Sequence, residues 1–352
     1  MDQQVGLRTQ ALNWRRVVSE DPDVVPTWVD VHYEADAGPL SRLPGLPSGI
    51  QGTLRGVREI RAGLGDVSRF DAVLWATWAA KSVPELVRAA PAALVMDMTP
   101  AQMEAMGAQY GYSRARARLG AGWKRRATDR LYAGARHLFP WNEWVAASLR
   151  DDYGVPADKI TAVSPGVDQR LFLPDPSARP GDGVVRLLFV GGDFIRKGGD
   201  LLLRWARETS ATGWELHLGT RDPVPDTPGV FAHGGLTNNS PELVRLYQRC
   251  DVFVLPTRAD CFSLVAMEAM SCGLPVVISR LGGIPEIVGD GESGFLLEPG
   301  DYGALASRLD LLVSDEGLRG RMGAAALVRA RERFDCRVNV GRVLEALKAV
   351  RG

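Results

Sequence analysis

The chain has 352 residues, a length typical of two domains of ordinary size. Hydrophobic residues make up 45% and charged residues 24% of it, a mixture that excludes an intrinsically disordered protein. Lys and Arg together number 42, and so do Asp and Glu, so the formal net charge is zero. This balance argues against a protein whose main task is to bind nucleic acid through its phosphates.

The cysteine and histidine positions argue against metal and disulfide sites. The four cysteines lie in the last third of the chain without a Cys-x-x-Cys pair, and the four histidines are scattered singly. This pattern predicts reduced thiols and no resident metal. No apolar run approaches the ~20 residues that span a bilayer, and the first residues carry no signal-peptide pattern. We therefore expect a cytoplasmic protein.

The first half of the chain predicts an α/β domain over residues 1–168. Short apolar runs, which are typical of strands, alternate with amphipathic segments, which are typical of helices. The predicted strands are 24–31, 72–76, 93–96, 135–139 and 160–163, and the predicted helices are 9–18, 49–63, 100–107, 114–133 and 141–153. The first helix has only eight residues before it, where an α/β domain normally has a strand. We expect this first strand to be missing; the alternative is that the true start lies upstream.

A linker is predicted over residues 169–183, which are rich in proline and glycine. A second domain, 184–335, follows it, and a C-terminal helix over 336–352 is expected to pack back toward the first domain. The predicted strands are 185–190, 214–218, 230–232, 251–255, 275–278 and 294–297, and the predicted helices are 199–210, 241–250, 263–271, 301–313, 316–334 and 337–350. Continuous apolar strands that alternate with helices are typical of a doubly wound parallel sheet.

Residues 255–278 contain the most informative motif, a strand, a loop, a helix, a tight turn and another strand. Asp260 lies in the loop at the carboxyl end of the strand, where open α/β sheets place ligands. Ser263 suits a helix N-cap, so the amides of Phe262, Ser263 and Leu264 would form an anion site. Glu268 lies farther along the same helix, within reach of the same ligand. Alternatively, Asp260 only caps a helix and Glu268 is a solvated acid.

A second motif lies at residues 187–199, where a strand leads into a glycine-rich turn and then a helix. Gly191 and Gly192 allow a close approach of the backbone, and the cations Arg196 and Lys197 suit a diphosphate. The motif is neither G-x-G-x-x-G nor a P-loop, which disfavours a dehydrogenase or a P-loop enzyme. On its own, Arg-Lys-Gly is also an ordinary solvated turn.

Several motifs in order over residues 185–300 together resemble the signature of retaining family 4 glycosyltransferases, which are nucleotide-sugar-dependent enzymes of the GT-B fold. The motifs are Arg196-Lys197-Gly198, Asp260-x7-Glu268, Glu268-Ala-Met-x-Cys-Gly-Leu-Pro-Val-Val277, Leu281-Gly-Gly-Ile-Pro-Glu-Ile-Val288 and Gly291-Glu-Ser-Gly-Phe-Leu-Leu297. The resemblance implies two Rossmann-like domains that face a cleft between them, the first for the acceptor and the second for the donor.

The resemblance also implies roles for single residues. Lys197, helped by Arg196, would hold the donor diphosphate, and the amides of residues 262–264 would bind its β-phosphate. Glu268 would bind the ribose hydroxyls. Asp260, at the position of the first Glu of the family's paired-Glu motif, would contact sugar hydroxyls.

The chain departs from the family pattern at three positions. Gly192 stands where an Arg is common, so Arg196 would have to compensate. Asp260 is one methylene shorter than Glu, which would alter the sugar preference. Asp97 follows a predicted strand where many members have a His, so we assign Asp97 to the face of the anomeric carbon.

The predicted function is transfer of a hexosyl group from a UDP- or GDP-sugar to a glycan or lipid-linked acceptor, as in polysaccharide biosynthesis. Cations and helix-end amides would stabilise the leaving diphosphate, so no metal or other cofactor is expected. The resemblance implies retention by front-face attack. Two alternatives stay open: a catalytically degenerate nucleotide-sugar-binding protein, and a GT-B nucleotide-sugar epimerase.

A cluster of basic residues lies in 114–136, with eight cations against one acid, Asp129. One interpretation is a patch for an anionic acceptor or for peripheral contact with the inner face of a membrane. The commoner use of such a cluster is a solvated, arginine-rich helix that pairs with acids elsewhere.

Overall fold

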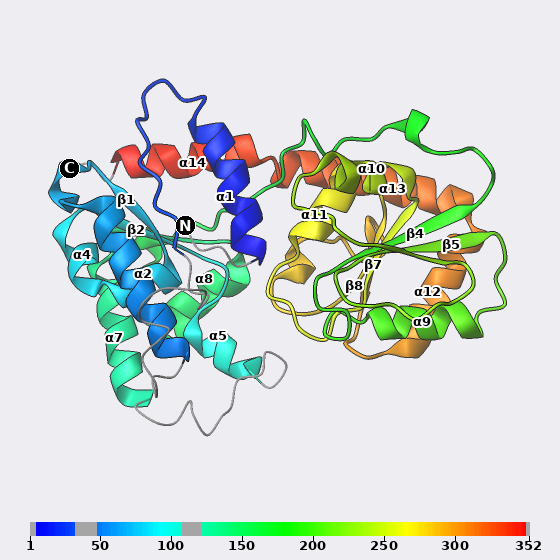
Figure 1. Ribbon diagram of the computed structural model, residues 1–352, viewed down its shortest axis with the longest axis horizontal. Helices are drawn as coiled ribbons and strands as arrows, with labels where there is room; N and C mark the ends of the chain where they lie inside the picture. The colour runs from blue at the N-terminus through cyan, green and yellow to red at the C-terminus, as the bar shows by residue number, and fades with distance from the viewer. Residues whose placement is uncertain (1–4, 32–47, 108–120, 350–352) are drawn as a thin grey trace. The chain divides into compact units, whose positions relative to one another are not determined.

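The computed structural model describes residues 5–31, 48–107 and 121–349. Within them the chain forms two compact units (Figure 1). The first takes in the described residues of 1–105, 112–165 and 337–352, and the second those of 106–111 and 166–336. None of the described helices is both long and apolar enough to cross a membrane.

The first unit is built around a parallel sheet of three short strands. They pair in the order β1-β2-β3 and are β1 (Val73–Ala76), β2 (Ala92–Met96) and β3 (His137–Pro140). Every residue of β2 is buried, as expected for a middle strand with both faces covered. The helices are α1 (Val5–Val18), α2 (Ser48–Leu64), α3 (Thr77–Ser82), α4 (Pro84–Ala89), α5 (Pro100–Ala105), α7 (Ala121–Gly134), α8 (Glu143–Asp151) and most of α14 (Cys336–Ala349), with 3-10 turns at Val67–Arg69 and Ala157–Lys159.

The C-terminal helix α14 is tied to the segment that follows α1. Arg337 pairs with Glu20, and the Lys348 ammonium lies 3.5 Å from an Asp21 oxygen. Such half-exposed pairs each contribute little to stability. Val340 and Val343 of this helix are fully buried, so burial of its apolar side is the larger stabilising term.

Two strands predicted in the first half are wrong. Of the segment 24–31 only Val31 forms a bridge, and of the segment 160–163 only Ile160 does, to Leu138. Segment 160–163 does lie along β3, since the Thr161 and Val163 amides donate to the Leu138 and Pro140 carbonyls at 3.0 and 2.8 Å. Pro140 has no N–H to return the next bond, so the ladder stops at a single bridge. The other three strands are confirmed. The predicted helix 114–133 lies outside the described residues as far as residue 120.

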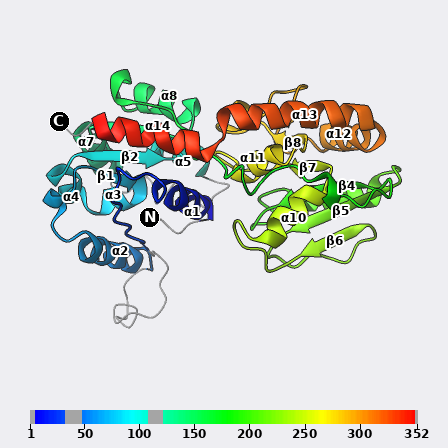
Figure 2. The same cartoon turned by 90° about the horizontal axis from the view of Figure 1, so that it is seen from above.

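The second unit holds a sheet of six strands, all parallel, in the order β6-β5-β4-β7-β8-β9. Figure 2 shows this order from β6 to β8. The strands are β4 (Val185–Val190), β5 (Trp214–Gly219), β6 (Val230–His233), β7 (Val252–Leu255), β8 (Val276–Ser279) and β9 (Gly294–Leu297). All six agree with the sequence prediction to within one residue at each end. The predicted α/β class with two parallel sheets is confirmed.

Helices cover both faces of this second sheet. They are α9 (Gly199–Glu208), α10 (Pro241–Arg249), α11 (Leu264–Ser271), α12 (Tyr302–Ser314) and α13 (Glu316–Arg333), with 3-10 turns at Pro176–Ala178 and Ile284–Glu286. The Trp205 indole of α9 donates to Asp310 of α12 at 2.9 Å, and Tyr247 of α10 contacts Glu268 of α11. In Figure 1, α9 and α12 lie on one side of the strands, and α10, α11 and α13 on the other.

The strand order reverses between β4 and β7. From β4 the chain moves outward through β5 and β6, and from β7 it moves the other way through β8 and β9. Open α/β sheets bind ligands outside the carboxyl ends of the strands at this switch point. The loops that follow β4 and β7 carry the two motifs found in the sequence, so the topology brings both motifs to one edge of the sheet.

Candidate active site

The loop after β4 turns sharply before α9. The Lys197 amide donates to the Asp193 carbonyl at 2.9 Å, and Gly198 has a left-handed φ of 82°. A Cβ atom at Gly198 would lie 2.1 Å from the Pro256 carbonyl oxygen, which belongs to the loop after β7. Only glycine fits where these two loops touch.

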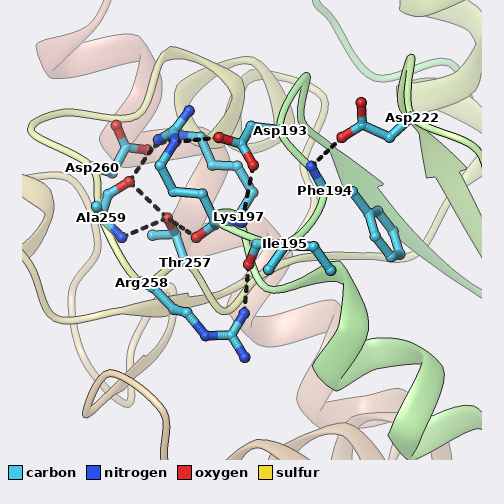
Figure 3. Close-up of polar contacts among 10 residues, drawn as sticks. Asp193, Phe194, Ile195, Lys197, Asp222, Thr257, Arg258, Ala259 and Asp260 are labelled. Carbon is cyan, nitrogen blue, oxygen red and sulfur yellow. Dashed lines mark hydrogen bonds and ion pairs between the residues drawn. The ribbon is translucent and has the colours of Figure 1, made fainter. Parts of the chain in front are cut away.

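The loop after β7 is held against the first loop by backbone and side-chain bonds. The Arg258 amide donates to the Arg196 carbonyl at 2.8 Å. The Arg258 guanidinium donates to both carboxylate oxygens of Asp200, at 2.6 and 2.8 Å. It also donates to the Ile195 carbonyl (Figure 3). The sequence analysis did not identify Arg258 and Asp200. An Arg in the loop after one strand and an Asp at the start of a helix are visible in the sequence and could have suggested an ion pair between the two loops.

Lys197 and Asp260 meet across the two loops. The Lys197 Nζ lies 2.6 Å from the Asp260 Oδ2, and Figure 3 shows both side chains between the loops. Their side chains are 15% and 10% exposed, respectively, so water screens this pair far less than a surface pair. The two motifs therefore converge, as the sequence predicted.

Arg196 points to a different set of partners from Lys197. Its Nε lies 2.9 Å from an Asp193 carboxylate oxygen, and its Nη1 donates to the Ala259 carbonyl at 2.9 Å. Thr257 also donates to the Ala259 carbonyl, at 3.0 Å (Figure 3). The Arg196 guanidinium thus connects the two loops, while its role toward a diphosphate stays a prediction.

The two glycines after β4 have different surroundings. A Cβ atom on Gly191 would lie 3.0 Å from the Phe189 ring and 3.1 Å from the Lys197 side chain. Gly191 therefore lets the stem of Lys197 lie against the backbone. A Cβ atom on Gly192 would meet nothing within 4 Å, so the space for a larger side chain is open there.

The amino end of α11 lies beside this ion pair in the sequence and in the fold. Ser263 is its N-cap, with an extended backbone and a side chain that accepts from the Ala266 amide at 3.4 Å. The next loop closes on this end, because Gly283 donates to the Cys261 carbonyl at 2.8 Å. Capping leaves other amides of the first turn, among them Leu264, without a partner inside the helix. With the helix dipole, such amides suit an anion.

Glu268 lies one turn into α11 and is almost fully buried, with 4% of the residue exposed. Its Oε2 accepts a hydrogen bond from the Tyr247 hydroxyl at 2.9 Å. Burial raises the pKa of Glu268 to about 7, although the Tyr247 bond opposes this rise. Burial, and next to it the Glu268 charge, raise the pKa of Tyr247 well above its usual value. Sequence reasoning found Glu268 but missed Tyr247, since nothing in the sequence pairs these two positions.

Asp97 lies in the first unit, directly after β2, and is half-buried. The next residues form a buried polar group, in which Thr99 and Ser148 lie 2.7 Å apart and Gln102 accepts from the Thr99 amide at 3.0 Å. These hydrogen bonds fix the backbone that follows Asp97 at the carboxyl end of β2. Its assignment to the sugar stays a prediction.

The basic cluster is described only from residue 121 on. There Arg125 pairs with Asp129 at 2.8 Å and stacks on Tyr153 at 4.2 Å. These contacts of Arg125 agree with the second interpretation of the cluster, a solvated, arginine-rich helix whose arginines pair within their own domain. In the described part of the chain, no group of three or more His, Cys, Asp or Glu residues is placed to hold a metal ion.

Part of the chain is similar to known proteins. Residues 231–329 match the family described as "Glycosyl transferases group 1". The chain is similar to the D-inositol 3-phosphate glycosyltransferase of Thermobifida fusca, with 33% identity over 232 residues that cover 58% of this chain and 53% of that protein. The corresponding protein of Stackebrandtia nassauensis is 34% identical over 53% of this chain and 48% of its own length. The chain thus spans about half the length of these relatives.

Solved structures show the same fold. Sucrose-phosphate synthase from Thermosynechococcus elongatus superposes with a TM-score of 0.69 at 22% identity, over 94% of this chain and 86% of that one. WaaG, a glycosyltransferase involved in lipopolysaccharide biosynthesis, gives 0.68 at 14% identity, over 97% and 96%. The chain has the GT-B fold, and its residues 231–329 match the group 1 glycosyl transferases, the family that its motifs predicted.

Proposed function

We propose that this protein is a retaining hexosyltransferase that uses a UDP- or GDP-sugar as donor and a glycan or lipid-linked molecule as acceptor. In this proposal the second unit binds the donor and the first unit binds the acceptor. The observation that carries it is the meeting of Lys197 and Asp260 at the switch point of the second sheet, 2.6 Å apart. One cation and one carboxylate there can bind the phosphate and the hydroxyls of the same nucleotide sugar.

The proposed chemistry is electrostatic. As the bond to the sugar breaks, negative charge grows on the β-phosphate of the leaving nucleoside diphosphate. The Lys197 ammonium and the amides of residues 262–264 stabilise this charge from fixed positions, which needs no reorganisation during the reaction. The acceptor hydroxyl then attacks from the face that the diphosphate leaves and gives its proton to a phosphate oxygen of that diphosphate, and the configuration of the sugar is retained.

The remaining donor contacts are assigned to carboxylates. Asp260 binds sugar hydroxyls, and Glu268 binds the ribose hydroxyls. A carboxylate with a raised pKa accepts such bonds best above that pKa, so donor binding through Glu268 strengthens as the pH rises through about 7. Asp97 is assigned to the face of the anomeric carbon.

The acceptor is the least constrained part of the proposal. The two relatives compared above are named D-inositol 3-phosphate glycosyltransferases. This name makes a phosphorylated cyclitol the first acceptor to test beside glycan and lipid-linked ones.

The test incubates the protein with radiolabelled UDP- and GDP-sugars and a set of acceptors that includes D-inositol 3-phosphate. Release of nucleotide together with a labelled, retained glycoside in the product supports the proposal. Donor binding without release or transfer would instead identify a degenerate binder, and conversion of one sugar into another would identify an epimerase. Lys197→Met is the control, because it keeps the length of the side chain and removes the charge.

A further inference from the structure

The two carboxylate oxygens of Glu268 have different surroundings. Oε2 accepts a hydrogen bond from the Tyr247 hydroxyl at 2.9 Å. Oε1 accepts none from the part of the chain that the structure describes, although it is not sealed from solvent. Polar atoms on a residue that is only 4% exposed normally have partners. Oε1 is therefore the oxygen that a ligand can use.

Packing fixes the position of the Tyr247 hydroxyl. Tyr247 lies in the last turn of α10, on the same side of the sheet as α11 (Figure 1), and is fully buried. Its ring meets Phe172 edge-on, with 5.6 Å between the ring centroids, and stacks with Phe253 of β7 at 6.1 Å. Both phenylalanines are buried as well. A ring enclosed by close-packed aromatic side chains has little freedom to move, so its hydroxyl stays in one place.

A fixed donor matters for a side chain as long as that of Glu268. Glutamate has three rotatable side-chain bonds, and ordering such a side chain when a ligand binds weakens the affinity. The bond from Tyr247 to Oε2 orders the carboxylate before a ligand arrives. It also sets the direction in which Oε1 faces, and a hydrogen bond to a ligand hydroxyl depends on that direction.

We propose that Tyr247 is a positioning residue, which holds Glu268 so that Oε1 accepts from a ribose hydroxyl and the site selects ribonucleotides over their deoxy analogues. This inference rests on the proposed role of Glu268 in donor binding. A site built to bond a hydroxyl rejects an analogue that lacks it, because its own acceptor is left without a partner. Among the described residues the Tyr247 hydroxyl donates to Glu268 alone, so it acts on the nucleotide through that carboxylate.

The test measures by calorimetry the affinity of the protein for UDP and GDP and for their 2′-deoxy and 3′-deoxy analogues. For the wild type we expect at least one deoxy analogue to bind about 10-fold more weakly than its parent nucleotide. Tyr247→Phe keeps the ring and removes the hydroxyl, and we expect it to reduce this ratio to about 2-fold. Inorganic diphosphate has no ribose, so its affinity should be the same for both proteins.

Tyr302→Phe is the matched control. The Tyr302 hydroxyl also donates to a glutamate, Glu208, at 2.8 Å, but on an exposed surface, so the ratio should not change. In a Glu268→Gln background, Tyr247→Phe should have no further effect on the ratio, because it acts through Glu268. If Tyr247→Phe does not fold, Phe172→Leu replaces it. This variant loosens the packing of the Tyr247 ring and leaves both partners of the bond in place, and it should also lower the ratio.

Two results would overturn the inference and leave the proposed function standing. One is a ratio that Tyr247→Phe leaves as large as in the wild type, and the other is a wild type that binds every deoxy analogue as tightly as UDP or GDP. A wild type that binds no nucleotide at all would contradict the proposed function, and the inference with it.

Discussion

Lys197 and Asp260 are 63 positions apart in the chain, yet their charged atoms lie 2.6 Å apart at the carboxyl ends of β4 and β7. In the proposed reaction both groups have other partners, the diphosphate for Lys197 and the sugar for Asp260. The donor must therefore separate this pair when it binds. The pair keeps the charges compensated until then, in a place where water screens them weakly.

Asp260→Asn is expected to separate binding from turnover. Without the competing carboxylate, Lys197 is free for phosphate, so affinity for UDP or GDP alone should rise about 10-fold. Turnover should fall, because the sugar loses a charged acceptor. Calorimetry with the nucleotides and a transfer assay measure the two effects, with Asp193→Asn as control, since Asp193 pairs with Arg196. Nucleotide affinity that falls with turnover would contradict the competition.

Lys197→Met is expected to lower turnover about 100-fold, the size seen when one donor to a developing charge is removed. Lys197 is only 15% exposed, and its loss leaves Asp260 without its cation. We expect a loss of stability on the order of 1–3 kcal/mol. The double variant Lys197→Met, Asp260→Asn should regain stability but not turnover. Recovery of both would make the pair purely structural.

Glu268 predicts a pH dependence of stability. Its pKa is about 7 in the folded protein and 4.5 ordinarily, so the folded state binds more protons between these values. Its contribution to the free energy of unfolding is therefore full below about pH 4.5 and is lost as the pH rises through about 7. His217 and His233, whose pKa values are lowered mainly by burial, act in the opposite direction.

Comparison with Glu268→Gln isolates this contribution, because Gln accepts the Tyr247 bond but does not titrate. Urea unfolding at about pH 5 and pH 8 gives the two free energies. We expect the wild type to lose more stability than the variant over this interval. Equal losses would mean that Glu268 is ionised in the folded protein throughout.

Gly192→Arg is expected to strengthen donor binding. The position has open space for a Cβ atom and no left-handed φ, so an Arg is tolerated without strain. A second cation beside Lys197 should raise affinity for UDP or GDP by about 5-fold at low salt, and the gain should shrink at high salt. Gly192→Gln is the uncharged control. A gain of the same size with Gln would assign the effect to something other than charge.

The sequence by itself determined the second unit. Continuous apolar runs such as 185–190 and 251–255 form buried parallel strands, since a strand covered on both faces needs apolar residues at every position. The first half gave a weaker signal. Segment 24–31 has the composition of a strand, but pairing depends on a neighbour that the local sequence does not specify. Segment 160–163 lies along β3, but Pro140 has no N–H for a full ladder.

The tertiary structure alone decided the partners within the candidate site. In the sequence, the adjacent cations Arg196 and Lys197 are equally suited to bind a phosphate. In the structure, Arg196 connects two loops and Lys197 pairs with Asp260. Likewise, the sequence allows Glu268 to be a solvated helix acid, but in the structure it accepts a bond from Tyr247 and burial raises its pKa. Periodicity is a property of a chain segment and is visible in its residues, whereas the partner of a charge depends on which loops the sheet order brings together.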